Sequence, residues 1–137
     1  MSPIQTMNSI YTLLFVSLLF AFAGCSGDSQ VTGTVTFADG TPLTMGTVCF
    51  EKKGENFVGY GDLQSDGTYS MGKSKDGQGL PAGEYLVYIR GAIRQEMGPD
   101  GPVTFKLIAE KFSSSASSEL SCQVQGKTVL DIEVTKP

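Results

Sequence analysis

Short runs of alternating apolar and polar residues, separated by Gly, Asp and Pro, fill the chain from Gln30 onward. In the first run, Val31, Gly33, Val35 and Phe37 alternate with threonines. Successive side chains of a strand point to opposite faces of a sheet, so this alternation predicts strands with one buried face. No stretch after Gln30 keeps a helical period. The pattern predicts one all-β domain, an antiparallel sandwich of about seven strands.

The later runs predict further strands, including one within residues 57–63 and a last one over 129–135. The inward side chains of the other runs are expected to be Val48, Phe50, Tyr69, Met71, Tyr85, Val87, Ile89, Leu120, Cys122 and Val124. We expect residues 91–111 to be irregular, with a turn over 98–102, and 112–118 to form a serine-rich loop. Loops are the usual place for recognition, so a partner would be sought along 91–119.

The segment before Cys25 differs from the rest because residues 1–24 contain no charged side chain. Its mostly apolar run Ile10–Gly24 is shorter than the roughly 20 residues that a membrane-spanning helix needs. The run has the length of the apolar region of a signal peptide and is expected to be helical. We therefore predict a signal peptide over 1–24, a flexible tether over 25–29 and a folded domain over 30–137. An uncleaved helix and an ordinary signal peptide cut near residues 21–23 are the alternatives.

The sequence Phe22-Ala-Gly-Cys25 resembles the lipobox of bacterial lipoproteins, although Phe22 replaces the usual leucine and no Lys or Arg precedes the apolar run. The resemblance implies cleavage between Gly24 and Cys25, diacylglycerol on the Cys25 thiol and an acyl chain such as palmitate on the new amino terminus. Several acyl chains give stable membrane anchoring, whereas one is marginal. The expected location is the cell envelope, and Ser26 favours the outer membrane or the periplasmic face.

Four segments of the predicted domain resemble the carboxypeptidase regulatory-like domain. They are Val31-x-Gly-x-Val-Thr-Phe-x-Asp-Gly-Thr-Pro-Leu43, Gly46-Thr-Val-x-Phe-Glu51, Asp66-Gly-x-Tyr69-Ser70 and Leu80-Pro-Ala-Gly-Glu-Tyr85. The chain is similar to the small lipoproteins of this type that are abundant in planctomycetes. The resemblance implies a transthyretin-like (prealbumin-like) sandwich. Its motifs consist of turn and core residues, so it implies a fold and no particular activity.

Two further cysteines raise the question of a disulfide, which an exported protein could form. Cys49 lies between inward Val48 and Phe50 and should point outward, whereas Cys122 shares the inward phase of Leu120. Side chains on opposite faces of a sheet cannot meet in the geometry that a disulfide needs. We expect both thiols to be unpaired, with a bridge as the alternative.

Aspartate precedes glycine at four places, namely Asp39-Gly40, Asp66-Gly67, Asp76-Gly77 and Asp100-Gly101. Calcium sites need about six to eight oxygen ligands, usually spaced closely in one loop. Each of these aspartates stands alone, so turns are the favoured interpretation and no metal is expected.

Composition limits the possible functions of the chain. It contains no histidine, the commonest general base and metal ligand. The net charge of −4 and the pI of about 4.7 disfavour nucleic acid as a partner. A hydrolase would have to use carboxylates, either Asp62 with Asp66 or Asp131 with Glu133.

We therefore predict a non-enzymatic envelope lipoprotein without a cofactor, whose sandwich acts as an interaction or structural module. Its partner would be another envelope protein, a peptide or a glycan. One alternative is a carbohydrate-binding accessory domain that presents outward aromatic side chains, for which Tyr60 and Tyr88 are the candidates. A carboxylate-dependent hydrolase is the other alternative.

Overall fold

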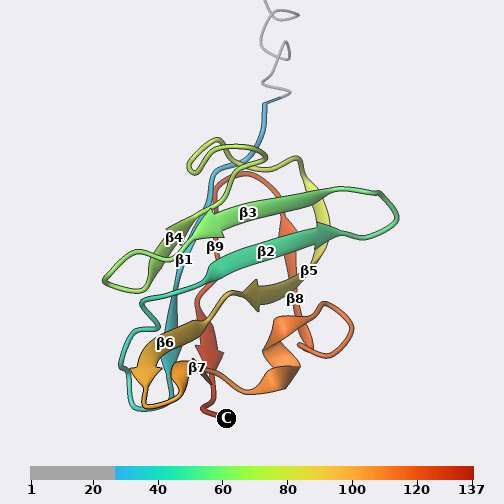
Figure 1. Ribbon diagram of the computed structural model, residues 1–137. Coiled ribbons are helices and arrows are strands. Elements are labelled where there is room, and N and C mark those ends of the chain that lie inside the picture. The colour runs from blue at the N-terminus through green and yellow to red at the C-terminus, as the bar shows by residue number, and fades with distance from the viewer. Residues whose placement is uncertain (1–26) are drawn as a thin grey trace, which may run out of the picture.

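The computed structural model describes residues 27–137, which form an all-β domain (Figure 1). The predicted signal peptide, the cleavage site and Cys25 lie outside the described residues. The strands are β1 (Val31–Phe37), β2 (Thr47–Lys52), β3 (Val58–Asp62), β4 (Thr68–Ser70), β5 (Gly83–Arg90), β6 (Ile93–Gly98), β7 (Gly101–Lys106), β8 (Leu120–Val124), β9 (Thr128–Val129) and β10 (Ile132–Val134). A short 3₁₀ helix, η2 (Glu110–Ser113), precedes β8.

Two sheets form the sandwich and a hairpin projects from it (Figure 1). In the first sheet, β1 lies between antiparallel β4 on one side and parallel β9 and β10 on the other. The second sheet is antiparallel in the order β3-β2-β5-β8. Backbone hydrogen bonds between Tyr60 and Gly72 join β3 to the segment after β4, so the two sheets are linked at this edge.

The core lies between the two sheets and consists largely of the side chains that the alternation predicts to point inward. Val31 and Val35 of β1, Val48 and Phe50 of β2 and Val87 of β5 are completely buried. The remaining inward positions are buried or packed against this cluster, namely Phe37, Tyr69, Met71, Tyr85, Ile89, Leu120, Cys122 and Val124. The predicted all-β sandwich and the predicted inward faces are therefore confirmed. The strand pairing differs from the prediction in one respect, because β9 and β10 run parallel to β1.

The predicted last strand is divided into β9 and β10 where it passes Gly33. The carbonyl oxygen of Leu130 approaches so closely that a Cβ atom at Gly33 would lie 1.9 Å from it. Tyr69, which is 3% exposed, donates a hydrogen bond from its hydroxyl to that carbonyl. Only a residue without a side chain fits at position 33, and the Tyr69 hydroxyl supplies a hydrogen-bond donor to this partly buried carbonyl.

The expectation that residues 91–111 are irregular was wrong, because they contain the hairpin of β6 and β7. Only its turn within 98–102 was predicted. Both faces of the hairpin are exposed, and even Met97 is 84% accessible. The apolar and polar residues of β6 do not alternate, and the short alternation Val103-Thr-Phe105-Lys in β7 corresponds to no buried face. Burial therefore gave these two strands no clear sequence signal.

The serine-rich segment is more ordered than a simple loop. It begins within η2, where Phe112 is buried against the core. Ser118 is also buried, and its hydroxyl donates to the carbonyl of Val87 in β5. These two contacts hold residues 110–118 against the second sheet.

Within residues 27–137, the structure contains no helix that is long and apolar enough to cross a membrane.

Replacement of Tyr69 by Phe should lower the free energy of unfolding by about 1 kcal/mol, because the partly buried carbonyl of Leu130 loses this donor. Tyr60→Phe is the matched control, since Tyr60 is 36% exposed and should change stability by less than about 0.5 kcal/mol. Urea unfolding of both variants measures the difference. Equal stabilities would show that the Tyr69 hydrogen bond does not hold the divided strand.

Candidate functional site

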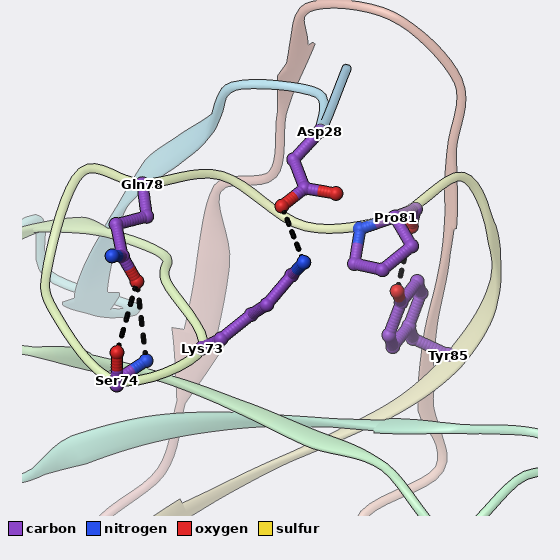
Figure 2. A network of polar contacts seen from close by, with 6 residues as sticks. All are labelled: Asp28, Lys73, Ser74, Gln78, Pro81 and Tyr85. Carbon is purple, nitrogen blue, oxygen red and sulfur yellow. Dashed lines mark hydrogen bonds and ion pairs between the residues drawn. The ribbon is translucent and has the colours of Figure 1, made fainter. Parts of the chain in front are cut away.

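Polar contacts tie the beginning of the domain to the loop between β4 and β5 (Figure 2). The Asp28 carboxylate and the Lys73 ammonium form an ion pair at 2.7 Å. Ser29 and Leu80 exchange backbone hydrogen bonds of 2.7 and 2.8 Å. The predicted tether over 25–29 therefore already belongs to the fold at its last two residues.

The same loop is fastened to the core at its other end. Tyr85 is fully buried and donates a hydrogen bond of 2.6 Å from its hydroxyl to the carbonyl of Pro81 (Figure 2). Burial raises the pKa of Tyr85 to about 12, so this donor keeps its proton at neutral pH. Within the loop, Gln78 accepts from the backbone and hydroxyl of Ser74. The loop is thus held by the core on one side and by Asp28 on the other.

This end of the sandwich lies far from the hairpin. The chain enters the domain at the top of Figure 1, whereas β6, β7, η2 and the carboxyl terminus lie at the bottom. The domain therefore has an entry end, with Asp28 and Lys73, and an opposite end that carries the exposed hairpin.

The outer face of the second sheet brings together Tyr60, Cys49 and Tyr88. Cys49 of β2 pairs with Tyr60 of β3 on one side and with Tyr88 of β5 on the other. The guanidinium of Arg90 lies 5.4 Å from the centre of the Tyr60 ring, which is a cation–π contact. The two tyrosines named as carbohydrate candidates are thus neighbours across one strand. Tyr60 is exposed and Tyr88 is half-buried.

Cys49 faces outward as predicted, and its side chain is completely buried, which the alternation does not predict. Tyr60 and Tyr88 lie on either side of it on the neighbouring strands. Burial raises the pKa of the Cys49 thiol. Cys122 lies on the inner side of β8 and is half-buried, and burial raises its pKa also. The two thiols are free and lie on opposite faces of the sheet, as the alternation predicted.

All four Asp–Gly pairs lie at turns, with positive φ at Gly40, Gly67, Gly77 and Gly101. Asp39 accepts hydrogen bonds from the backbone and hydroxyl of Thr41, at 3.0 and 2.7 Å. Asp66 accepts the same pair from Thr68, at 3.0 and 2.6 Å. These bonds from threonine lower the pKa of both carboxyl groups. Among residues 27–137, no three Cys, Asp or Glu side chains form a group that could hold a metal ion.

The carboxylates named as catalytic pairs serve separate local contacts. Asp62 accepts a hydrogen bond of 2.8 Å from the Thr47 hydroxyl, whereas Asp66 holds its own turn. Asp131 accepts from the backbone N–H and the hydroxyl of Thr34, at 3.0 and 2.9 Å. Glu133 is exposed and lies opposite Thr36. Each carboxylate in the two pairs thus has a surface position or a structural partner of its own.

A groove of about 540 Å³ lies on the outer face of the first sheet. Hydroxyl groups of Thr32 and Thr34 in β1 and of Thr68 and Ser70 in β4 line it. Asp131 and Asp76 contribute carboxylates from the divided last strand and from the loop after β4. The outward threonines of β1 were predicted from the alternation. The presence of Asp76 and Asp131 in one groove could not be predicted, because no sequence spacing relates the two residues.

Comparisons with known proteins show no family to which the chain belongs. No family model matches the chain, and no curated protein matches it. The resemblance to the carboxypeptidase regulatory-like domain therefore stays a prediction.

The comparison with solved structures gives two similar chains. One is a DUF3823 family protein from Parabacteroides merdae, with 20% sequence identity over 82% of this chain and a TM-score of 0.47. The other is a 9R-lipoxygenase from Cyanothece, with 15% identity over 88% of this chain and a TM-score of 0.36. The chain spans 48% of the length of the first protein and 20% of the second.

Thiol labelling tests the position of Cys49. In the native protein, N-ethylmaleimide should label Cys122 faster than Cys49, because Cys49 is completely buried whereas Cys122 is half-buried. Denaturation should make both equally reactive. Peptide mass spectrometry measures the labelling at each site. A peptide pair joined by a Cys49–Cys122 disulfide would contradict the structure.

The Asp66 turn should make stability depend on pH. The pKa of Asp66 is lower in the folded protein than its ordinary value of 3.8, so its ionised form stabilises the fold. This contribution is complete above pH 3.8 and is lost as the pH falls through the lower folded-state pKa. The stability advantage of the wild type over Asp66→Asn should therefore shrink between neutral pH and about pH 2. Urea titrations over this range measure it.

Asp100→Asn is the control for the Asp66 variant, because Asp100 lies in another Asp–Gly turn and forms no side-chain hydrogen bond with the described residues. Identical pH profiles for both variants would contradict a stabilising role of the Asp66 charge.

Proposed function

We propose that this chain is a cell-envelope lipoprotein, cleaved between Gly24 and Cys25 and anchored to a membrane by lipid on Cys25. Its β-sandwich serves as a non-enzymatic interaction or structural module. The similarity of Phe22-Ala-Gly-Cys25 to the lipobox and the uncharged segment before it support the anchor. The resemblance of the domain to small planctomycete lipoproteins supports the same assignment.

The described residues indicate where such an anchor would act, because only a few residues separate Cys25 from the fold. Ser29 already forms backbone hydrogen bonds with Leu80, and Asp28 already forms an ion pair with Lys73. Four residues span at most about 14 Å even when fully extended. Lipid on Cys25 would therefore hold the entry end of the sandwich close to the bilayer surface.

This attachment orients the domain. The hairpin of β6 and β7 lies at the end opposite to the entry of the chain, so it would face away from the membrane (Figure 1). The sides of the sandwich, including the groove on the first sheet, would stand beside the anchor and stay accessible to envelope proteins, peptides or glycans. We place the protein at the outer membrane or on the periplasmic face.

The residues available support a non-enzymatic role. The chain has no histidine, and the carboxylates considered as catalytic pairs hold turns and strand contacts instead. A module that binds a partner requires no such group.

The intact mass of the protein extracted from membranes tests the anchor. We expect a chain that begins at Cys25 and carries the added mass of one diacylglycerol and one acyl group. Globomycin, which blocks lipoprotein signal peptidase, should cause accumulation of a diacylglyceryl form that still carries residues 1–24.

Cys25→Ser is the control, since it removes the only thiol at the cleavage site and preserves the length of the chain. It should lose the lipid mass and be released from the membrane fraction. An unmodified wild-type chain, cut elsewhere or uncut, would refute the lipoprotein assignment.

A further inference from the structure

We propose that the groove on the outer face of the first sheet binds a neutral, polyhydroxylated ligand, namely a short segment of uncharged glycan. The inference deepens the proposed role as an interaction module and is independent of the lipid on Cys25. It rests on the volume of the groove, the chemistry of its walls and one carboxylate held in place by the fold. Its volume of about 540 Å³ lies within the range of about 300–1,000 Å³ that is typical of small-molecule sites.

The walls of the groove offer the hydrogen-bonding groups that sugar hydroxyls require. Thr32 and Ser70 line it, and neither hydroxyl has a hydrogen-bond partner among the described residues. The Gln64 side chain adds an amide. A hydroxyl or amide can both donate and accept, and a sugar hydroxyl does the same.

Asp131 is the fixed element of the site. Its Oδ1 atom accepts both hydrogen bonds from Thr34, the backbone one at 3.0 Å and the hydroxyl one at 2.9 Å. The Oδ2 atom accepts no hydrogen bond from the described residues, so it can accept one from a ligand hydroxyl. A carboxylate oriented before binding loses little side-chain freedom, and a hydrogen bond to a charged acceptor is stronger than one between neutral groups.

The charge of the groove selects against anions. Two carboxylates, Asp76 and Asp131, line it, and none of the residues that line it is a lysine or arginine. A phosphate, a sulfate or an acidic sugar would meet negative charge without a compensating cation. An uncharged glycan has no such penalty.

An apolar surface at the rim of the groove would suit the apolar C–H face of a sugar ring. Val129 of β9 lines the groove and is 61% exposed. The C–H face of a pyranose could cover it while the hydroxyls reach Thr32 and Asp131. Sites for small ligands commonly combine a few oriented polar groups with such apolar contacts.

Chemical-shift titration of the ¹⁵N-labelled full chain tests the proposal. The protein is held in dodecylphosphocholine micelles, because detergents with sugar headgroups would compete. The probes are cellohexaose, maltohexaose and chitohexaose, with hexagalacturonate as the acidic counterpart. We expect at least one neutral probe to shift the amides of Thr32, Thr34 and Ser70 saturably, and hexagalacturonate to bind at least tenfold more weakly.

Two matched pairs of variants locate the site. Thr32→Val should weaken binding about three- to tenfold, whereas Thr36→Val, the same change on the same face of β1 but outside the groove, should not. Asp131→Asn should weaken it at least tenfold, because the amide retains an acceptor for Thr34 but loses the charge. Glu133→Gln removes a charge from β10, two residues after Asp131 and outside the groove, and should have no effect.

Several results would overturn the inference. The absence of saturable shifts with every neutral probe would exclude this ligand class. Equal binding of hexagalacturonate would refute the charge argument. Chemical-shift changes confined to Tyr60 and Tyr88 would show that the glycan binds the second sheet and not the groove. None of these results changes the mass of the lipidated protein, so the anchor and the glycan site can fail separately.

Discussion

The hydrogen bond from Tyr69 to the carbonyl of Leu130 is the contact on which the first sheet depends. The C-terminal strand pairs with β1 in two pieces, and between them the Leu130 carbonyl comes within reach of Tyr69 beside Gly33. Loss of the donor to this partly buried carbonyl would destabilise the fold. Gly33 has no side chain and therefore leaves room for the Leu130 carbonyl, and the Tyr69 hydroxyl donates a hydrogen bond to it. The strand can therefore change course without losing its register on either side.

The same divided strand creates the polar surface of that sheet. Since backbone pairing is interrupted beside Thr34, its N–H donates to the carboxylate of Asp131. The side chain that completes the sheet is thus also a charged group fixed at the surface. The second sheet uses its outer face differently, because Tyr60 and Tyr88 flank a buried thiol there. The two sheets share one core but present unlike chemistry to a partner.

Much of the fold could be predicted from alternation. In a strand with one buried face, every second residue is apolar, so the sequence shows which residues point inward. Val31 and Val35, Val48 and Phe50, and Tyr85 with Val87 all point inward as expected. The hairpin of β6 and β7 could not be predicted, since Met97 and its neighbours are exposed on both faces and no burial constrains them. Cys49 was assigned to the correct face, but its burial depends on side chains from β3 and β5 that lie beside it only after folding.

The sequence by itself determined the all-β class, the inward face of most strands, the Asp–Gly turns and the opposite orientation of Cys49 and Cys122. These properties are local, because the pleat of a strand and the conformation of a turn involve residues that are near neighbours in the chain. Tertiary structure alone decided that Asp76 and Asp131 line one groove, that Leu130 meets Gly33 and Tyr69, and that Lys73 reaches Asp28. Each of these contacts joins segments that are distant in sequence, and only the packing of the two sheets brings them together.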